Sequence, residues 1–297
     1  MDKKFVILIF FFSTLAFIAP QILIPFKGLI PFLLGLVMLA MGMTIDLKDL
    51  KKTFKNPKWI IVGIFLQYTL MPFFAFILSI ILELSNELLL GMIILGSCPG
   101  GTASNVIAYL SRANLPLSIS LTLISTLLSF VFTPLLILLY GKQLIDIELK
   151  NLITTTFLII IIPITLGIIL KKFLKKNIDI FTNYAPLLSQ FIIAFIIGVI
   201  LSLNSSDILE INYKLFLAII LHNLLGIMSG YICSKLLKFP KDVRKTIAIE
   251  VGMQNSGLGV SLSLIHFTKI VALPSALFSL WHNISAIVLI NLWTKKK

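Results

Sequence analysis

Glu250 is the acidic residue whose position in this sequence most strongly suggests chemistry. It lies inside a long apolar segment, in the stretch EVGMQNSGLGV, whereas the other acidic residues fall near segment ends or between segments. A carboxylate in apolar surroundings is costly unless a cation accompanies it, and no Lys or Arg stands at a comparable depth in any apolar segment. The neighbouring Gln254 and Asn255 offer oxygen atoms, which favour a hard cation, or a bound proton, over a transition metal.

A second polar interruption occurs in the apolar stretch ILGSCPGGTASNVIAYL. Pro99 lacks a backbone donor, and Gly100 and Gly101 adopt conformations that other residues resist, so we expect the helix to break at these three residues. Ser104 and Asn105 follow directly and offer further oxygens. Freed carbonyls and half-helix ends can bind cations and polar substrates at mid-membrane depth, although either interruption alone could be only a kink or a close helix contact.

These residues must be positioned by membrane-spanning helices. The chain is 58% hydrophobic and 12% charged, a composition that points to lipid surroundings and excludes an ordinary soluble domain. A nucleic-acid partner is not expected, because an excess of basic residues in such a chain reports topology. Dividing the chain at its charged or polar residues predicts ten membrane-spanning segments of about 20 residues each. They are 5–26, 28–45, 58–82, 88–111, 115–141, 151–170, 180–203, 212–237, 243–267 and 271–293.

The basic residues predict the orientation of these spans. Of the 25 Lys and Arg residues, all but Lys27, Lys142, Lys150, Lys214 and Lys269 fall at the ends that share a side with the N-terminus. Because Lys and Arg accumulate on the cytoplasmic side, both termini are predicted in the cytoplasm. The basic start and apolar run of the first segment also resemble a signal peptide, but the apolar stretch continues to Phe26 without a clear cleavage site, so we interpret it as the first span.

Ten spans divide into two halves of five, 1–142 and 143–297, and an odd number per half inverts the second half in the membrane. This is the inverted-repeat plan of many secondary transporters. The two polar interruptions fall in the fourth segment of each half, where such a plan places the binding site. Cys98 and Cys233 lie far apart in apolar segments, so they predict neither a disulfide framework nor a metal cluster.

Three motifs resemble the bile acid:sodium symporter family in its bacterial branch. They are CPGGTASNV, LSISLT and EVGMQNSGL, and the likeness in segment number and spacing extends over essentially the whole chain. The resemblance implies an all-α polytopic membrane protein of ten transmembrane helices, with a panel domain of helices 1, 2, 6 and 7 and a core domain of helices 3–5 and 8–10. The broken helices 4 and 9 would cross near the ion sites.

The resemblance also implies two co-transported Na+ ions and a set of substrate contacts. The first ion would be held by Ser104, Asn105, Ser118, Thr122 and Glu250. The second would be held by Gln67, Glu250, Gln254 and the carbonyls of Val251 and Met253. The candidate substrate contacts are Thr102, Asn255, His282 and Asn283. From the residues alone, Gln67 is more typical of a packing hydrogen bond, and His282 with Asn283 of a satisfied polar pair.

The predicted function is a sodium-driven importer of an organic anion, either bile-acid-like or a small carboxylate, working by alternating access in the inner membrane. A proton-coupled carrier that protonates Glu250 is one alternative, and a membrane sensor that binds its ligand without moving it is another. An intramembrane enzyme using Cys98 or His282 has the least support, because no base is suitably spaced from Cys98. We therefore predict that the chain is not an enzyme.

Overall fold

The computed structural model describes residues 3–45, 55–146, 148–174, 178–208 and 213–294. Within these ranges all regular elements are helical, and none is a strand. The first half contains α1 Lys3–Ile18, α2 Pro20–Leu23, the 3-10 turn η1 Ile24–Leu29, α3 Ile30–Thr44, α5 Pro57–Ile81, α6 Asn86–Ser97, α7 Ala103–Leu110 and α8 Leu115–Gly141. The second half contains α9 Leu149–Thr156, the π-helical turn η2 Phe157–Ile161, α10 Ile162–Leu174, α11 Ile178–Leu203, α12 Ser205–Ile208, α13 Tyr213–Leu236, α14 Lys241–Gly252, α15 Ser256–His266 and α16 Lys269–Thr294.

Six helical stretches among the described residues are long and apolar enough to cross a membrane. Four shorter apolar helices accompany them: Ile7–Ile18, Asn86–Ser97, Leu187–Leu203 and Ser256–His266. The predicted class, a polytopic all-α membrane protein, is confirmed. The six long stretches are Pro20–Thr44, Pro57–Ile81, Leu115–Gly141, Leu149–Leu174, Tyr213–Leu236 and Lys269–Thr294.

The predicted boundary between the first two segments, near residue 27, was wrong. α1 ends at Ile18, and Ala19 leaves the helical conformation with φ −141° and ψ 63° before Pro20 begins α2. Proline cannot donate its backbone nitrogen, and it disfavours the helical conformation in the residue before it, so Pro20 starts a new helix instead of continuing α1. The basic residues of 46–54 and 175–177, which entered the orientation argument, lie outside the described residues.

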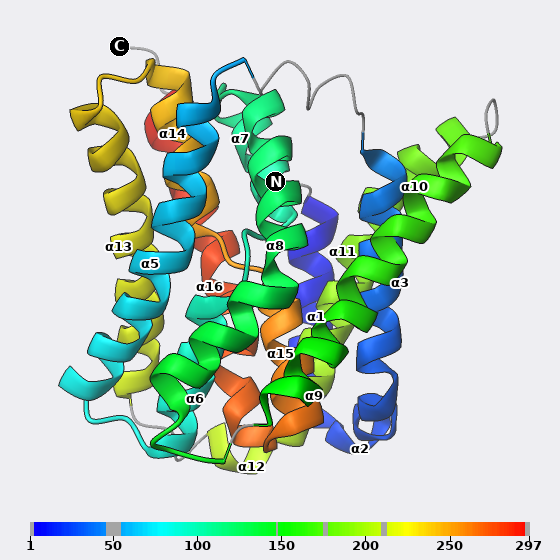
Figure 1. Ribbon diagram of the computed structural model, residues 1–297. Coiled ribbons are helices and arrows are strands. Elements are labelled where there is room, and N and C mark those ends of the chain that lie inside the picture. Colours follow the sequence, from blue (N-terminus) through cyan, green and yellow to red (C-terminus); the bar gives the residue numbers. More distant parts are fainter. Residues whose placement is uncertain (1–2, 46–54, 147, 175–177, 209–212, 295–297) are drawn as a thin grey trace.

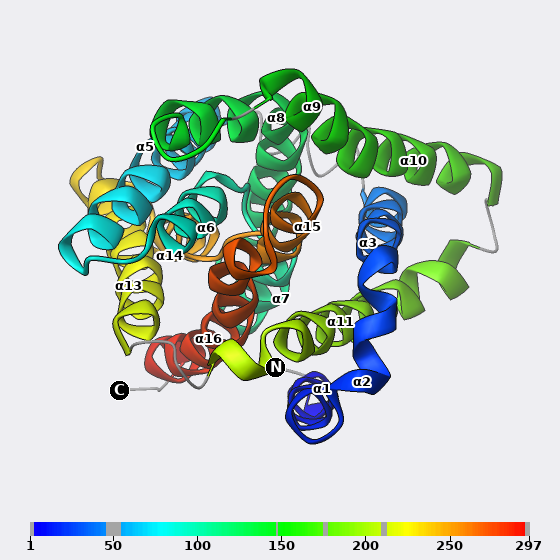
Figure 2. The same cartoon turned by 90° about the horizontal axis from the view of Figure 1, so that it is seen from below.

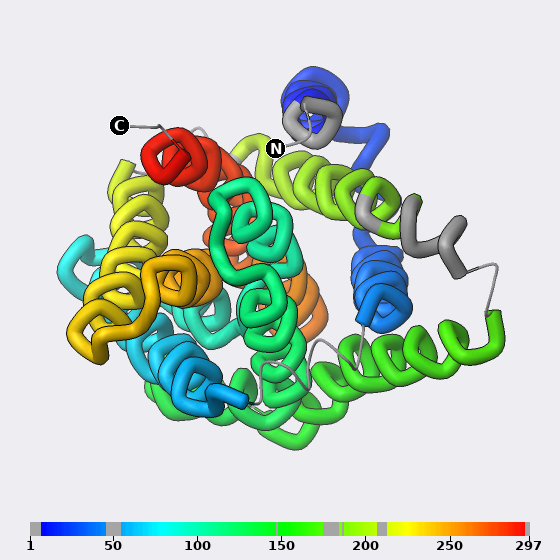
Figure 3. The backbone as a smooth tube through the Cα atoms, turned by 90° about the horizontal axis from the view of Figure 1, so that it is seen from above, coloured from blue at the N-terminus to red at the C-terminus, as the bar shows by residue number. Residues whose placement is uncertain are grey.

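The helices form two groups. α1 packs on α11, and α3 packs on both α10 and α11, so these four helices make one group. The other group joins α5, α6, α8, α13, α14, α15 and α16 through successive contacts. Figures 2 and 3 show the two groups side by side from opposite ends of the molecule. In Figure 1, α1 begins and α16 ends in the upper half of the molecule.

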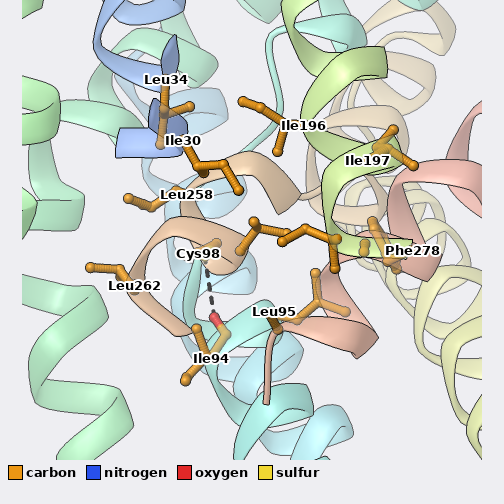
Figure 4. Close-up of a cluster of buried hydrophobic side chains, with 14 of the residues drawn as sticks. Ile30, Leu34, Ile94, Leu95, Cys98, Ile196, Ile197, Leu258, Leu262 and Phe278 are labelled. Atoms are coloured by element: carbon orange, nitrogen blue, oxygen red, sulfur yellow. Dashed lines mark hydrogen bonds between the residues drawn. The ribbon is translucent and has the colours of Figure 1, made fainter. Parts of the chain in front are cut away.

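A buried apolar cluster joins the two groups. Leu34 of α3 and Ile197 of α11 meet Leu258 of α15 and Phe278 of α16, all with almost no exposed surface (Figure 4). Burial of such side chains against one another contributes to helix association through close packing, since lipid is as apolar as they are. The cluster thus joins α3 and α11 to α15 and α16.

Candidate functional site

Both predicted helix breaks are present. The first break, residues 98–102, separates α6 from α7, and the second, residues 253–255, separates α14 from α15. The structure places Pro99, Gly100 and Gly101 in the first break. Irregular backbone at membrane depth is tolerated only where protein or a water-filled cavity satisfies its polar groups. The backbone N–H and C=O groups of these two segments must therefore have hydrogen-bond partners.

The two breaks satisfy each other. Gly101 N donates to Met253 O at 2.7 Å, and Asn255 N donates to Pro99 O at 2.8 Å. These bonds form a short antiparallel bridge between segments more than 150 residues apart in the sequence. Because each half supplies donors and acceptors to the other, the crossing point is fixed by backbone geometry.

Glycine is required where the two segments approach most closely. A Cβ atom at residue 101 would lie 2.7 Å from Gln254 O, which is closer than real Cβ contacts allow. A Cβ atom at residue 100 would lie 3.1 Å from Glu250 Oε2. The glycines therefore allow the first break to pack directly against the second and against the Glu250 carboxylate.

Glu250, on the last turns of α14, is surrounded by hydroxyl groups from the first half of the chain. Ser104 Oγ lies 2.5 Å from Glu250 Oε1, and Thr122 Oγ1 lies 2.7 Å from Oε2. Ser118 also donates to Oε1. All four side chains are buried. α7 supplies Ser104, and α8 presents Ser118 and Thr122 on one face because they are four residues apart.

No described residue forms an ion pair with Glu250. The carboxylate and the three hydroxyl oxygens instead make a compact set of hard oxygen donors. Hydroxyl groups can rotate to point lone pairs at a cation, and such oxygen-rich sets suit alkali and alkaline-earth ions. No cluster of three or more His, Cys, Asp or Glu side chains occurs in the described part of the chain, so the donors resemble no transition-metal centre there.

Asn105 extends this group toward the space between the two helix groups. Its Oδ1 lies 2.9 Å from Ser118 Oγ, whose single proton can be donated either to Asn105 or to Glu250, so Asn105 adjoins the carboxylate cluster. Its side chain also lines a larger cavity described below. The five residues predicted for the first ion are therefore brought together by α7, α8 and α14.

The residues predicted for the second ion form a neighbouring network. Gln67 Nε2, from α5, donates to Gln254 Oε1 at 2.6 Å, and Gln254 Nε2 donates to Val251 O at 3.2 Å. A small cavity of about 10 Å³, close to the room that one water molecule needs, lies against Gln67 and Glu250. The carbonyl of Met253 likewise accepts a hydrogen bond, from Gly101 N in the crossing.

A cavity of about 270 Å³ lies between the two helix groups. α3 and α11 form one wall, and α7, α8 and α16 form the other. Of the predicted substrate contacts, Thr102 and Asn283 line it, but Asn255 and His282 do not. Asn255 instead accepts from Leu258 N at 3.2 Å, which caps the start of α15, and the ring of His282 packs edge-on against Phe278.

Three polar residues near the site were not predicted. Ser125 Oγ accepts from Gly100 N at 3.3 Å, and Asn223 Nδ2 donates to Gly252 O at 2.8 Å, so both satisfy backbone groups freed by the breaks. Gln190 of α11 lines the large cavity. Ser125 could have been found because it follows Ser118 and Thr122 on the same helical face. The signal for Asn223 and Gln190 is only that each is polar within an apolar segment.

Cys98 takes no part in chemistry at this site. Its thiol is fully buried and donates to Ile94 O at 3.2 Å, one helical turn earlier (Figure 4). Its backbone carbonyl accepts from Gln67 Nε2 at 2.9 Å. The backbone of this residue, not its sulfur, contributes to the crossing.

The known proteins that this chain is similar to are described as sodium-dependent transporters or cotransporters. Residues 31–211, more than half of the chain, match the model of the Sodium Bile acid symporter family. The sodium-dependent transporter YocS of Bacillus subtilis is 40% identical over 99% of this chain and 92% of its own length. The probable chloroplastic sodium/metabolite cotransporter BASS1 of Arabidopsis thaliana is 36% identical over 88% of this chain and 66% of its own length. The human ileal sodium/bile acid cotransporter is 30% identical over 80% of this chain and 69% of its own length.

Proposed function

The chain belongs to the Sodium Bile acid symporter family, and we propose that it imports an organic anion by coupling its entry to that of sodium ions. Family membership makes it a sodium-coupled membrane transporter of a small molecule and not an enzyme. The observation that carries the proposal is the buried Glu250 carboxylate, which meets hydroxyl oxygens and no cationic side chain among the described residues. A bound sodium ion would supply the missing positive charge.

We assign the first sodium ion to the oxygens of Ser104, Asn105, Ser118, Thr122 and Glu250. In the structure the hydroxyl groups point hydrogens at the carboxylate, and rotation about their C–O bonds would turn lone pairs toward an ion instead. The ion would thus replace hydrogen bonds that the site makes on its own. The buried carboxylate would therefore have partners both with the sodium ion bound and without it.

We assign a second sodium ion to the small cavity beside Gln67 and Glu250. Gln254 and the carbonyls of Val251 and Met253 would complete it. Each of these two carbonyls already accepts one hydrogen bond, but a carbonyl oxygen has two lone pairs and can also contact an ion. Two ions with one monovalent anion would carry one net positive charge inward, gaining about 2.3 kcal/mol per 100 mV of membrane potential.

The proposed architecture is two inverted five-helix repeats, 1–142 and 143–297. Two side-chain contacts at opposite ends of the molecule support it. Asn114, before α8, donates to Asp242 in the first turn of α14, and Thr268, before α16, donates to Glu87 in the first turn of α6. Each contact joins the turn after one broken helix to the start of the other, as a two-fold relation between the repeats requires.

The two helix groups correspond to a panel domain and a core domain. Helices 1, 2, 6 and 7 of the proposed panel are α1, α3, the stretch α9–α10, and α11. The remaining helices make the proposed core, with the crossing at its centre. Sliding of the core against the panel would open the cavity to each side of the membrane in turn, which is alternating access.

The cavity lies at the end of the molecule that the positive-inside argument assigns to the cytoplasm. Its lining includes Thr44 and Ile45 at the end of α3, Ile119 near the start of α8 and Ala185 in the first part of α11. The apolar cluster of Figure 4 packs α3 and α11 against α15 and α16. We therefore interpret the structure as an inward-facing state of an inner-membrane protein with both termini in the cytoplasm. Thr102 and Asn283 are the proposed substrate contacts in this state. Asn255 and His282 do not line the cavity here, so their proposed contact with substrate requires another state of the transport cycle.

The experiment that tests this function is uptake by purified protein in liposomes. Labelled organic acids, including a bile acid and short monocarboxylates, are offered with an inward sodium gradient or an equal potassium gradient. We expect accumulation only with sodium, increasing when the interior is made negative. Equal uptake in potassium would overturn the proposal, uptake driven by a proton gradient alone would support the proton-coupled alternative, and sodium-dependent binding without accumulation would support a sensor.

A further inference from the structure

Lys245 is a buried cation that the proposed ion and substrate sites do not use. It lies in α14, and only 8% of its surface is exposed. Among the described residues, no carboxylate forms an ion pair with it. A buried ammonium group is costly unless hydrogen bonds or opposite charge compensate it, so the groups that it does contact must stabilise it.

The partners of Lys245 are the C-terminal ends of two helices. Its Nζ donates to Ser111 O at 2.9 Å, directly after α7, and to Trp293 O at 3.4 Å, in the last turn of α16. The ammonium group also lies over the ring of Trp293, 5.6 Å from the centroid. Carbonyl groups at a helix C-terminus lack partners within the helix and carry partial negative charge, so a cation is favourable there.

The helix that carries Lys245 offers no such stabilisation. α14 begins at Lys241, so Lys245 lies in its second turn, far from the C-terminus at which the helix dipole would favour a cation. The buried charge is therefore compensated only because α7 and α16 end beside it. Its role is in the contact between the three helices and not in the stability of α14 alone.

The three helices that meet at Lys245 carry the proposed ligands. α7 carries Ser104 and Asn105, α14 carries Glu250, and α16 carries Asn283. α7 has only eight residues and is thus about 12 Å long, so its first turn and its C-terminal end move together. A shift of the end that Lys245 holds would therefore displace Ser104 relative to Glu250.

The next residue of α14 holds the other side of the same turn. Thr246 Oγ1 accepts from Asn114 N at 2.8 Å, and Asn114 stands directly before α8, which carries Ser118 and Thr122. Lys245 and Thr246 thus attach the end of α7 and the start of α8 to one helix. The helix that supplies the carboxylate also holds the two helices that supply the hydroxyl groups.

From these contacts we propose that Lys245 is a positioning residue for the first sodium ion. By holding the C-terminal end of α7 against α14, it sets the distance between the oxygens of Ser104 and Asn105 and the Glu250 carboxylate, without touching the ion itself. The inference rests on the proposed function, since it assumes that these oxygens bind sodium. Replacing residues that orient metal ligands commonly weakens metal binding by about 10–100-fold.

The test measures sodium affinity separately from stability. Purified protein is titrated with NaCl at an ionic strength kept constant with choline chloride, and in parallel with KCl, and the rise in unfolding temperature gives the Kd. Lys245→Met keeps the length of the side chain but removes its charge and donors, and we expect its sodium Kd to rise about tenfold. Lys245→Arg keeps the charge and can donate to both carbonyl groups, so its Kd should stay within about threefold of the wild type.

Two variants serve as controls. Lys241→Met removes an exposed lysine one turn earlier on the same helix and should leave the sodium Kd unchanged. Ile137→Ala removes a fully buried side chain of α8, about 22 Å along the helix from Thr122. It should lower the unfolding temperature without changing the sodium Kd, because the cavity that it creates lies far from the ion.

The outcomes separate the inference from the function beneath it. If sodium stabilises the wild type and Lys245→Met has the same sodium Kd, the inference is overturned, even if that variant unfolds at a lower temperature. A loss of affinity in Lys245→Arg as large as in Lys245→Met would also overturn it. If sodium and potassium stabilise the wild type equally, the proposed function itself is contradicted.

A further variant covers the case in which Lys245→Met does not fold. Lys245→Gln keeps one donor group without the charge, so we expect a smaller rise in the sodium Kd, of about threefold. A Kd equal to that of the wild type in this variant would overturn the inference.

Discussion

Asn105 Oδ1 accepts a hydrogen bond from Ser118 Oγ at 2.9 Å, and this one contact joins the carboxylate cluster to the large cavity. The same Ser118 proton can instead be donated to Glu250, so a change at the carboxylate can redirect this proton and reach the cavity through two side chains. Such a chain is what coupling between ion and substrate needs, because each ligand must change the free energy of binding the other.

Replacing Asn105 by alanine should weaken the coupling more than the binding of either ligand alone. In the wild type we expect sodium to raise substrate affinity by about tenfold or more, within the usual range of coupling free energies. In Asn105→Ala the factor should fall below about threefold. Titrating substrate at several sodium concentrations measures it. Val106→Ala, which alters the cavity lining without touching the cluster, is the control, and an unchanged coupling factor in Asn105→Ala would contradict this role.

Replacing Glu250 by glutamine removes the charge but keeps the size of the side chain and one acceptor oxygen, while the new amide nitrogen can donate to a hydroxyl oxygen. We expect the protein to remain folded, while sodium-dependent uptake falls by roughly a hundredfold, corresponding to about 3 kcal/mol of lost cation interaction. Glu83→Gln makes the same chemical change at an 80% exposed side chain and should leave uptake unaltered. Normal transport by the Glu250→Gln protein would show that the cation site lies elsewhere.

Replacing Gly101 by alanine should destabilise the crossing of the two breaks. The added methyl group would lie 2.7 Å from the backbone oxygen of Gln254, so one of the two segments has to move. Crowding of this kind costs about 1–3 kcal/mol, and we expect a lower unfolding temperature together with weaker sodium dependence. Gly28→Ala is the matched control, because no atom lies within 4 Å of the added carbon, and its effect should be small. Equal unfolding temperatures for the two variants would refute the requirement for glycine.

Much of the fold could be predicted because hydrophobic segments and their charged ends are determined locally. The helix break at Pro99 and the intramembrane position of Glu250 follow from residue type alone. The charged residue Lys27 predicts a boundary near residue 27, but α1 ends earlier because Pro20 starts a new helix. A single basic side chain near a helix end can extend to the membrane surface without ending the helix. A proline instead disfavours the helical conformation in the residue before it, so it is the stronger signal of a helix boundary.

The residues of the carboxylate cluster could be predicted from sequence motifs, whereas the residues that surround the cluster could not. Ser104, Ser118 and Thr122 were assigned through motifs, and the structure brings them to Glu250. Gln190 was missed because its importance depends on which wall of a cavity it faces, and this depends on the packing of α11 against the other helices. A polar residue in an apolar segment has the same sequence signal whether it faces a cavity or a neighbouring helix.

The contact between Asn114 and Asp242 should contribute measurably to the stability of the core. Asn114 Nδ2 donates to Asp242 Oδ2 at 2.9 Å, and the Asn114 backbone nitrogen donates to Thr246 Oγ1 at 2.8 Å, so the turn before α8 is attached to the first turns of α14. A hydrogen bond to a charged group in a partly buried position contributes about 1 kcal/mol or somewhat more. A double-mutant cycle of Asn114→Ala and Asp242→Ala, followed by denaturation in detergent, isolates this interaction. The exposed local pair Asn151 and Glu148 is the comparison and should give a coupling free energy near zero, because solvent competes for both groups. If the two cycles give the same value, the Asn114 turn does not hold the halves of the chain together, and the two-fold relation loses one of its two supporting contacts.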